Sequence, residues 1–223
     1  MSPIFSVISS KKHNLQYNKF HNSIKLFMAQ KRKTRVACFA SGEGTNFSNL
    51  IQESANKNYE ICLLISNNSK SGVMERAKNH NVDSYHISSM IFDDPAKEML
   101  SVLKKNEIDV IALCGYMKKI DEKLLLEFKD RILNIHPSLL PKYCGQGMYG
   151  SKVHKAVFDN KEKESGATIH LVNEEYDKGR ILLQKSIPIN SNDGPDDISE
   201  KVRKIEFEIY PIALHEFCEG LSV

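Results

Sequence analysis

The sequence predicts an α/β fold: a single doubly wound, mostly parallel sheet with helices on both faces. Short apolar runs that end at Gly, Pro or Asn alternate with segments of helical periodicity, which is typical of βαβ units. The length of 223 residues and the 41% hydrophobic content suit one domain with a buried core. No apolar run approaches the roughly 18 residues of a membrane span. We therefore expect a globular protein without a membrane-spanning segment.

Five apolar runs account for the predicted parallel strands, which are residues 35–40, 60–66, 82–87, 109–113 and 131–135. Between them lie four segments of helical pattern, 46–54, 72–80, 95–105 and 121–128. In the first of these, Phe47, Leu50 and Ile51 stand at i, i+3 and i+4, one face of a helix. Pro95 opens the third at a position that suits a helix N-terminus.

The last third of the chain departs from this alternation. Residues 167–172 and 180–187 are strand-like, and the seven residues between them are too few for a helical crossover. An antiparallel or irregular pairing is therefore expected. Residues 198–217 close the chain as a helix with one apolar stripe, Ile198, Val202, Ile205 and Ile209.

Charge divides the chain into a basic leader or tail, residues 1–34, and a domain, residues 35–223. Residues 1–35 hold eight basic residues and no acidic ones, which leaves 23 basic against 28 acidic residues in the remainder. A mildly acidic domain lacks the basic charge that is typical of nucleic-acid-binding proteins. Three interpretations of the leader stay open: an organelle transit peptide, a disordered tail, or an upstream start codon with Met28 as the true start.

Five cysteines at irregular spacing, with no CxxC pair, indicate neither a disulfide framework nor a zinc site. We expect reduced thiols in a cytosol-like compartment and no bound metal.

A glycine-rich loop joins the first predicted strand to the first helix. Its glycines allow a tight turn, and the following helix offers free N–H groups and a partial positive charge to an anion. The loop lacks the Lys-Ser/Thr of a Walker motif and the third Gly of a dinucleotide fingerprint, so a monophosphate is the favoured ligand. The alternative is a tight turn in which Thr45 or Asn46 merely caps the helix. The candidate residues are Gly42, Glu43, Gly44, Thr45 and Asn46.

Asn134 and His136 stand two residues apart at the end of the fifth strand. Strand side chains alternate, so the two point the same way while Ile135 points into the core. An amide and an imidazole together can stabilise an oxyanion and move a proton. The alternative is a structural histidine held by a backbone carbonyl.

A carboxylate is expected to orient that imidazole. Asp177 lies in the loop before the last strand, but spacing alone does not select it over Asp109, Asp121 or Glu175. On the preceding strand, Thr168 and His170 share one face, where core packing is the alternative role.

Together these segments resemble the folate-dependent glycinamide ribonucleotide formyltransferases. The matching segments, in the family's order, are SGEGTN (41–46), ISNN (65–68), GYMKKI (115–120), NIHPSLLPKY (134–143), GMYGSKVHKAV (147–157), GATIHLV (166–172), DKGRILLQ (177–184) and EFEIYP (206–211). The resemblance implies a Rossmann-like formyltransferase fold. It also implies transfer of a formyl group from 10-formyltetrahydrofolate to the amine of glycinamide ribonucleotide, in purine biosynthesis.

The resemblance implies residue roles as well. Asn134 and His136 would polarise the formyl oxygen and stabilise the tetrahedral intermediate, and Asp177 would position His136 and help to move a proton. The glycine loop would hold the substrate phosphate, with the carboxylate of Glu43 turned to solvent. Further substrate positions are Glu206, Thr168 and His170, and positions along the folate pterin are Met117, Lys118, Lys119 and Ile120.

The resemblance implies no metal. The expected partners are small molecules, with no nucleic acid and no membrane. We expect a cytoplasmic protein that is a monomer or a homodimer. A formyltetrahydrofolate hydrolase shares the catalytic trio of Asn134, His136 and Asp177, but it carries a regulatory domain before the catalytic one. A methionyl-tRNA formyltransferase would need a further C-terminal domain and a basic surface. A non-catalytic folate- or nucleotide-binding module is the alternative from another class.

Overall fold

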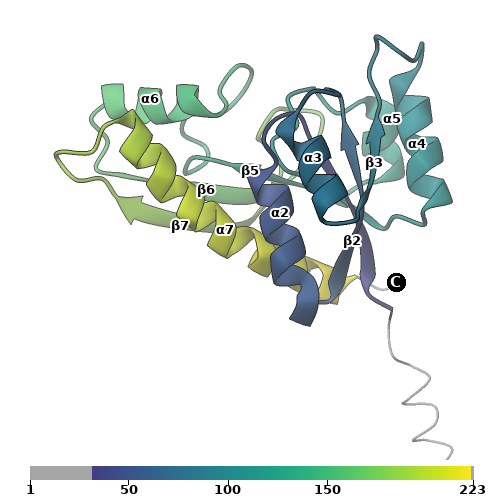
Figure 1. Cartoon of the computed structure of the whole chain (residues 1–223). Coiled ribbons are helices and arrows are strands. Elements are labelled where there is room, and N and C mark those ends of the chain that lie inside the picture. The colour runs from purple at the N-terminus through teal and green to yellow at the C-terminus, as the bar shows by residue number, and fades with distance from the viewer. Residues whose placement is uncertain (1–31, 222–223) are drawn as a thin grey trace, which may run out of the picture. The chain divides into compact units, whose positions relative to one another are not determined.

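Seven strands form one sheet in the order β3-β2-β1-β4-β5-β6-β7 (Figure 1). The structure is a computed structural model that describes residues 32–221. All but the last three residues of the predicted leader therefore lie outside the described residues.

The sheet is parallel over its first five strands. β1 (Thr34–Ala40), β2 (Tyr59–Ser66), β3 (Asp83–His86), β4 (Val110–Leu113) and β5 (Ile132–His136) pair in parallel. β6 (Glu164–Leu171) runs antiparallel to both β5 and β7 (Ile181–Pro188). The predicted mostly parallel sheet and the antiparallel pairing near its end are confirmed. Since the chain winds outward from β1 to β3 and then returns to β4, the carboxyl ends of β1 and β4 flank the switch point where such sheets bind ligands.

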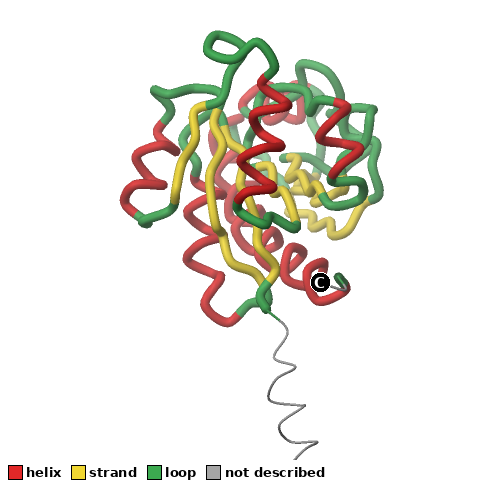
Figure 2. Tube along the Cα trace, turned by 90° about the vertical axis from the view of Figure 1, so that its right-hand side faces the viewer, coloured by secondary structure: helices red, strands yellow, loops and turns green. Residues whose placement is uncertain are grey.

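Helices cover both faces of the sheet, as predicted (Figure 2). Alternate strand residues belong to two separate hydrophobic clusters. One contains residues of α2 (Thr45–Gln52), α3 (Gly72–Asn79), α6 (Ser151–Asp159) and α7 (Pro195–Gly220). The other contains residues of α4 (Pro95–Lys105) and α5 (Glu122–Glu127). A short 3-10 helix, Glu53–Asn56, follows α2.

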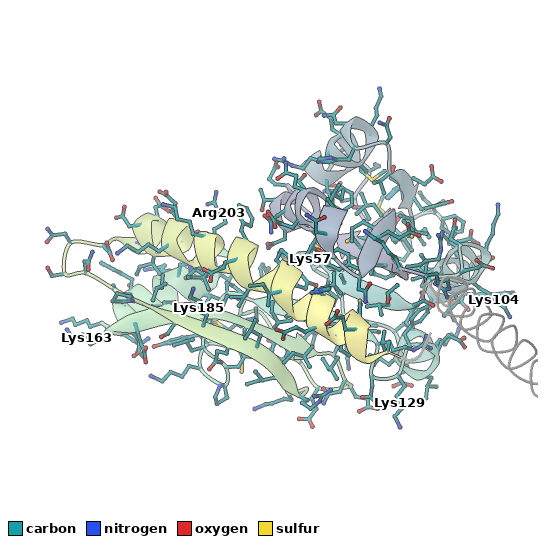
Figure 3. The ribbon with its side chains drawn as sticks, turned by 90° about the horizontal axis from the view of Figure 1, so that it is seen from below. Lys57, Lys104, Lys129, Lys163, Lys185 and Arg203 are labelled. Carbon is teal, nitrogen blue, oxygen red and sulfur yellow. The ribbon has the colours of Figure 1, made fainter. Side chains whose placement is uncertain are left out.

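The long helix α7 lies across β6 and β7 (Figure 3). Its predicted apolar stripe is buried against the sheet: Ile198 and Val202 are fully buried, and Ile205 and Ile209 nearly so. The helix continues through Pro211 to Gly220. In the view of Figure 3, Arg203 and Lys185 of β7 lie on opposite sides of α7.

Two features of the fold escaped prediction. Helix α6 begins in the GMYGSKVHKAV segment and ends two residues beyond it, and its buried Val153 and Val157 stand at i and i+4. β6 begins at Glu164, three residues before the predicted start, because its polar and glycine residues pair with β7 without adding an apolar signal. Among residues 32–221, no helix is long and apolar enough to cross a membrane.

Candidate active site

A cavity of about 390 Å³ opens at the carboxyl ends of the central strands. Its walls come from the loops that follow β1, β4, β5 and β6, and from one side of α7. That volume lies in the range of small-molecule sites. The predicted site residues that line it are Gly42, Glu43, Gly44, Thr45, Asn46, Met117, Lys118, Lys119, Ile120, Asn134, His136, His170, Asp177 and Glu206.

The alternation of β5 directs Asn134 and His136 away from the core beneath α6 and α7. Leu133 and Ile135 are buried in that core, so the amide and the imidazole emerge on the other face of the strand. The antiparallel register with β6 places His170 opposite Asn134 and Thr168 opposite His136. Four polar side chains of two neighbouring strands therefore share one face.

His136 is nearly buried, and both of its ring nitrogens face oxygen atoms. Nε2 lies 2.8 Å from the carbonyl oxygen of Tyr143, and Nδ1 lies 3.7 Å from Oδ2 of Asp177. Burial lowers the pKa of His136, and the Asp177 carboxylate and the Tyr143 carbonyl only partly oppose this shift. The ring is therefore mainly neutral at neutral pH and able to accept a proton, and the nearby carboxylate would stabilise the cation that results.

Asp177 reaches both histidines from the loop between β6 and β7. Its Oδ2 accepts a hydrogen bond from the Gly145 N–H at 2.9 Å, and its Oδ1 lies 3.5 Å from Nε2 of His170. Burial alone would raise the pKa of Asp177, but the contact with His170, the Gly145 N–H and the positive charge that His136 carries when protonated outweigh it and lower the pKa. The carboxylate is thus ionised at neutral pH. Its backbone is left-handed, with φ of 56°.

The glycine loop presents an open helix N-terminus to the cavity. The N-cap of α2 is Gly44, with φ of 73° and no side-chain cap, so neither Thr45 nor Asn46 caps the helix as the alternative required. A Cβ on Gly44 would lie 2.3 Å from Cγ2 of Val73, which explains why glycine is needed at this close approach. Glu43 is exposed, as expected, and its carbonyl accepts a hydrogen bond from Nε of Arg76 at 2.6 Å.

Glu206 links α7 to the glycine loop. Its Oε2 accepts a hydrogen bond from Nδ2 of Asn46 at 3.1 Å. Burial raises the pKa of Glu206 from 4.5 to about 7, against the opposing effects of the Asn46 amide and the Arg203 charge. One turn earlier on the same helix, the exposed Arg203 also lines the cavity. Sequence reasoning missed Arg203, although its i, i+3 spacing from Glu206 would have placed it on the same side of the helix.

The raised pKa of Glu206 makes folding stability depend on pH in a defined window. A carboxyl group with a pKa of about 7 in the folded state and about 4.5 in the unfolded state binds its proton more tightly when folded. Stability is therefore lost as pH rises from about 4.5 to about 7, by at most about 3 kcal/mol. We expect Glu206→Gln to become progressively more stable than the natural protein across that window in urea unfolding experiments. A stability difference that stays constant from pH 4.5 to 7 would contradict this account of Glu206.

The segment predicted to border the folate also lines the cavity. The Met117 N–H donates a hydrogen bond to Oγ of Ser41 at 2.8 Å, which ties the loop after β4 to the loop after β1. The Met117 side chain is half-exposed, whereas Ile120 is buried. Nζ of Lys119 lies 5.9 Å from the ring centre of Tyr176, a cavity residue that the sequence analysis did not single out.

Thr168 has a different environment from the substrate contact that the resemblance implies. It is fully buried and is not among the residues that line the cavity. Its hydroxyl donates to the carbonyl of Ser138 at 2.6 Å and accepts from the Leu140 N–H and from Gln184. Thr168 therefore supports the segment that leaves β5, and its contact with the substrate stays a prediction.

His154 is a cavity residue that sequence reasoning missed. It lies on α6, is nearly buried, and has an Nδ1 atom without a hydrogen-bond partner. Burial, together with the charges of Arg203 and His136, lowers its pKa to about 4. The ring is therefore neutral at physiological pH. Although His154 lies in the matching GMYGSKVHKAV segment, nothing in that segment marks it as a site residue, because its charged neighbours in space, His136 and Arg203, come from β5 and α7.

Within residues 32–221, no cluster of three or more His, Cys, Asp or Glu side chains could hold a metal ion.

The formyl transferase family matches residues 34–214 of the chain. The chain therefore belongs to the formyl transferase family.

The names of individual relatives are more specific than the name of the family. The chain is 37% identical over 199 residues to phosphoribosylglycinamide formyltransferase, chloroplastic, of Arabidopsis thaliana, an alignment that covers 84% of this chain. It is 34% identical over 194 residues to phosphoribosylglycinamide formyltransferase of Haemophilus influenzae, covering 83% of this chain and 88% of that protein. The chain spans 66% of the length of the Arabidopsis relative and 62% of the length of the Vigna unguiculata relative.

Solved structures share the fold of this chain. Glycinamide ribonucleotide transformylase 1 from Symbiobacterium toebii superposes with a TM-score of 0.80 at 28% identity, over 86% of this chain and 90% of that one.

Proposed function

We propose that this protein transfers the formyl group of 10-formyltetrahydrofolate to the amine of glycinamide ribonucleotide, a step of purine biosynthesis. The observation that carries the proposal is the meeting of Asn134, His136 and Asp177 beside an uncapped glycine loop in one cavity. The names of relatives that align over most of this chain support it.

The catalytic trio would act on the tetrahedral intermediate that forms when the amine attacks the formyl carbon. The Asn134 amide would donate a hydrogen bond to the formyl oxygen as it becomes an oxyanion. In the neutral ring Nε2 of His136 donates to the Tyr143 carbonyl, so Nδ1 would accept the proton that the amine loses, and Asp177, 3.7 Å from Nδ1, would stabilise the imidazolium. The proton would then pass to the folate nitrogen as its bond to the formyl carbon breaks. The amine is itself the nucleophile, so no Ser or Cys nucleophile is required.

The two substrates would enter from different walls of the cavity. The N–H groups behind Gly44 would bind the phosphate of the ribonucleotide, with Glu206 accepting hydrogen bonds from its ribose. The segment Met117–Ile120 would border the pterin of the folate through apolar and backbone contacts. This arrangement would bring the amine and the formyl group together at the end of β5.

An absorbance assay of folate deformylation, with and without glycinamide ribonucleotide, tests the proposal. Turnover that requires the ribonucleotide, with formylated ribonucleotide as product, is the expected result. Turnover without the amine would instead identify a formyltetrahydrofolate hydrolase. No turnover under either condition, for a protein that still binds folate, would favour a binding module.

Arg203 provides a prediction specific to the ribonucleotide. Its guanidinium is the cation on the α7 side of the cavity that we expect to pair with the substrate phosphate. We expect Arg203→Ala to raise the KM for glycinamide ribonucleotide about tenfold, with little change in the KM for folate. Lys204→Ala, one residue further on the same helix but outside the cavity lining, serves as the matched control. Equal effects on both KM values would argue against a phosphate contact.

The proposed function also raises the question of the compartment in which the reaction takes place. All five cysteines are free, which suits a reducing compartment such as the cytoplasm. The two plant relatives are named chloroplastic, which supports testing residues 1–34 as a targeting segment. Fluorescent fusions of the full chain and of a chain starting at Met28 should differ in location if that segment is a signal.

A further inference from the structure

His170 faces Asn134 more than it faces the cavity. The register of β5 with β6 pairs the two residues, and Nε2 of His170 lies 3.1 Å from Nδ2 of Asn134. The His170 residue is only 2% exposed. Its contacts with its strand neighbour and the backbone therefore leave little of the ring for a substrate.

A backbone contact determines which nitrogen of His170 carries the proton. Nδ1 lies 2.8 Å from the carbonyl oxygen of Leu171. A carbonyl oxygen can only accept a hydrogen bond, so Nδ1 must be the protonated nitrogen. In the neutral ring, Nε2 is then left with a lone pair directed at Asn134.

That lone pair selects one of the two orientations of the Asn134 amide. With Oδ1 toward the ring, two acceptors would face each other, whereas Nδ2 in that place can donate a hydrogen bond. Oδ1 of the ionised Asp177, 3.5 Å from the same ring nitrogen, has no hydrogen to offer, and it accepts one from Nε2 only when the ring is an imidazolium. One amide hydrogen of Asn134 is thereby directed to His170, and the second stays available to a ligand in the cavity.

We propose that His170 is a positioning residue that holds the Asn134 amide with a free N–H toward the formyl oxygen. The inference rests on the proposed function, in which Asn134 stabilises the oxyanion. If the amide turned over, Oδ1 would face the developing negative charge and repel it. His170 would therefore act on the transition state through Asn134, rather than by contact with either substrate.

Two substitutions of His170 separate this role from a general structural one. In His170→Asn, the amide group occupies the place of Nδ1 and can donate to the Leu171 carbonyl, but nothing replaces Nε2. In His170→Gln, the terminal oxygen can occupy the place of Nε2 and accept from Asn134. We expect His170→Asn to lower kcat at least about tenfold with KM changed less than about twofold, and His170→Gln to stay within about threefold of the natural kcat.

Equal losses in the two variants, or a loss confined to KM, would overturn the proposal. Thermal unfolding of both variants checks that each is folded. A second measurement needs no substrate: nitrogen-15 NMR of the histidine rings reports the tautomer directly. Protonated Nδ1 with bare Nε2 is expected, and a protonated Nε2 in the neutral ring would overturn the proposal. Absence of formyl transfer in the natural protein would defeat the proposed function and leave this tautomer test to judge the amide orientation by itself.

Discussion

Replacing His136 with Ala is expected to lower kcat for formyl transfer at least about a hundredfold, the low end for a positioned proton-transfer group. Burial keeps the ring mainly neutral, and Asp177 lies 3.7 Å from Nδ1 to stabilise the cation. No other group of the trio can accept a proton at neutral pH as readily, since Asn134 does not titrate and the pKa of Asp177 is low. Steady-state kinetics with saturating folate and ribonucleotide measure the effect.

The matched control is His86→Ala at the end of β3, a histidine outside the lining of the cavity. It should leave kcat within about twofold, because the substituted ring has no role in proton transfer. Near-normal kcat in His136→Ala would defeat the proposed mechanism, whatever the control shows.

Asn134→Ala is expected to lower kcat about a hundredfold to a thousandfold, as removal of an oxyanion donor does in other acyl-transfer enzymes. The amide belongs to β5, opposite His170, and lines the cavity. Asn134→Asp should lose at least as much, because it has the same shape but presents a negative charge to the oxyanion. Single-turnover kinetics with enzyme in excess isolate the chemical step from product release.

Ligand affinity provides the control for these variants. We expect the dissociation constant of glycinamide ribonucleotide to change less than about threefold in Asn134→Ala, because an interaction made only in the transition state does not contribute to ground-state binding. If Asn134→Asp kept most of the natural kcat, the amide could not be the oxyanion donor.

Most of the fold could be predicted from the sequence because its signals are local. Four of the five parallel strands are short apolar runs, whereas β3 is polar and partly exposed. The helix predicted at 95–105 matches α4 in both bounds. The pairing of β5 with β6 could not be predicted in the same way, since it joins residues about 36 positions apart across α6. That pairing brings His170 opposite Asn134, so the contact between these two side chains depends on the register of the strands and not on a sequence motif.

The candidate site was predictable where one element carries it. Strand alternation placed Asn134 and His136 together, and the glycine loop indicated an open helix N-terminus. Asp177 could be selected only by resemblance, because its loop approaches β5 through the antiparallel extension of the sheet. Arg203 and His154 were missed for a similar reason: helices α7 and α6 bring them to the cavity from segments whose apolar faces dominate their patterns.

The left-handed backbone of Asp177 restricts what can replace it. Among residues with a side chain, Asn and Asp adopt this conformation most readily, and Ala does so at a cost. An Ala at this position would therefore confound two changes, a displaced turn and a missing charge. Asn retains the turn and removes the charge alone, which makes it the informative exchange.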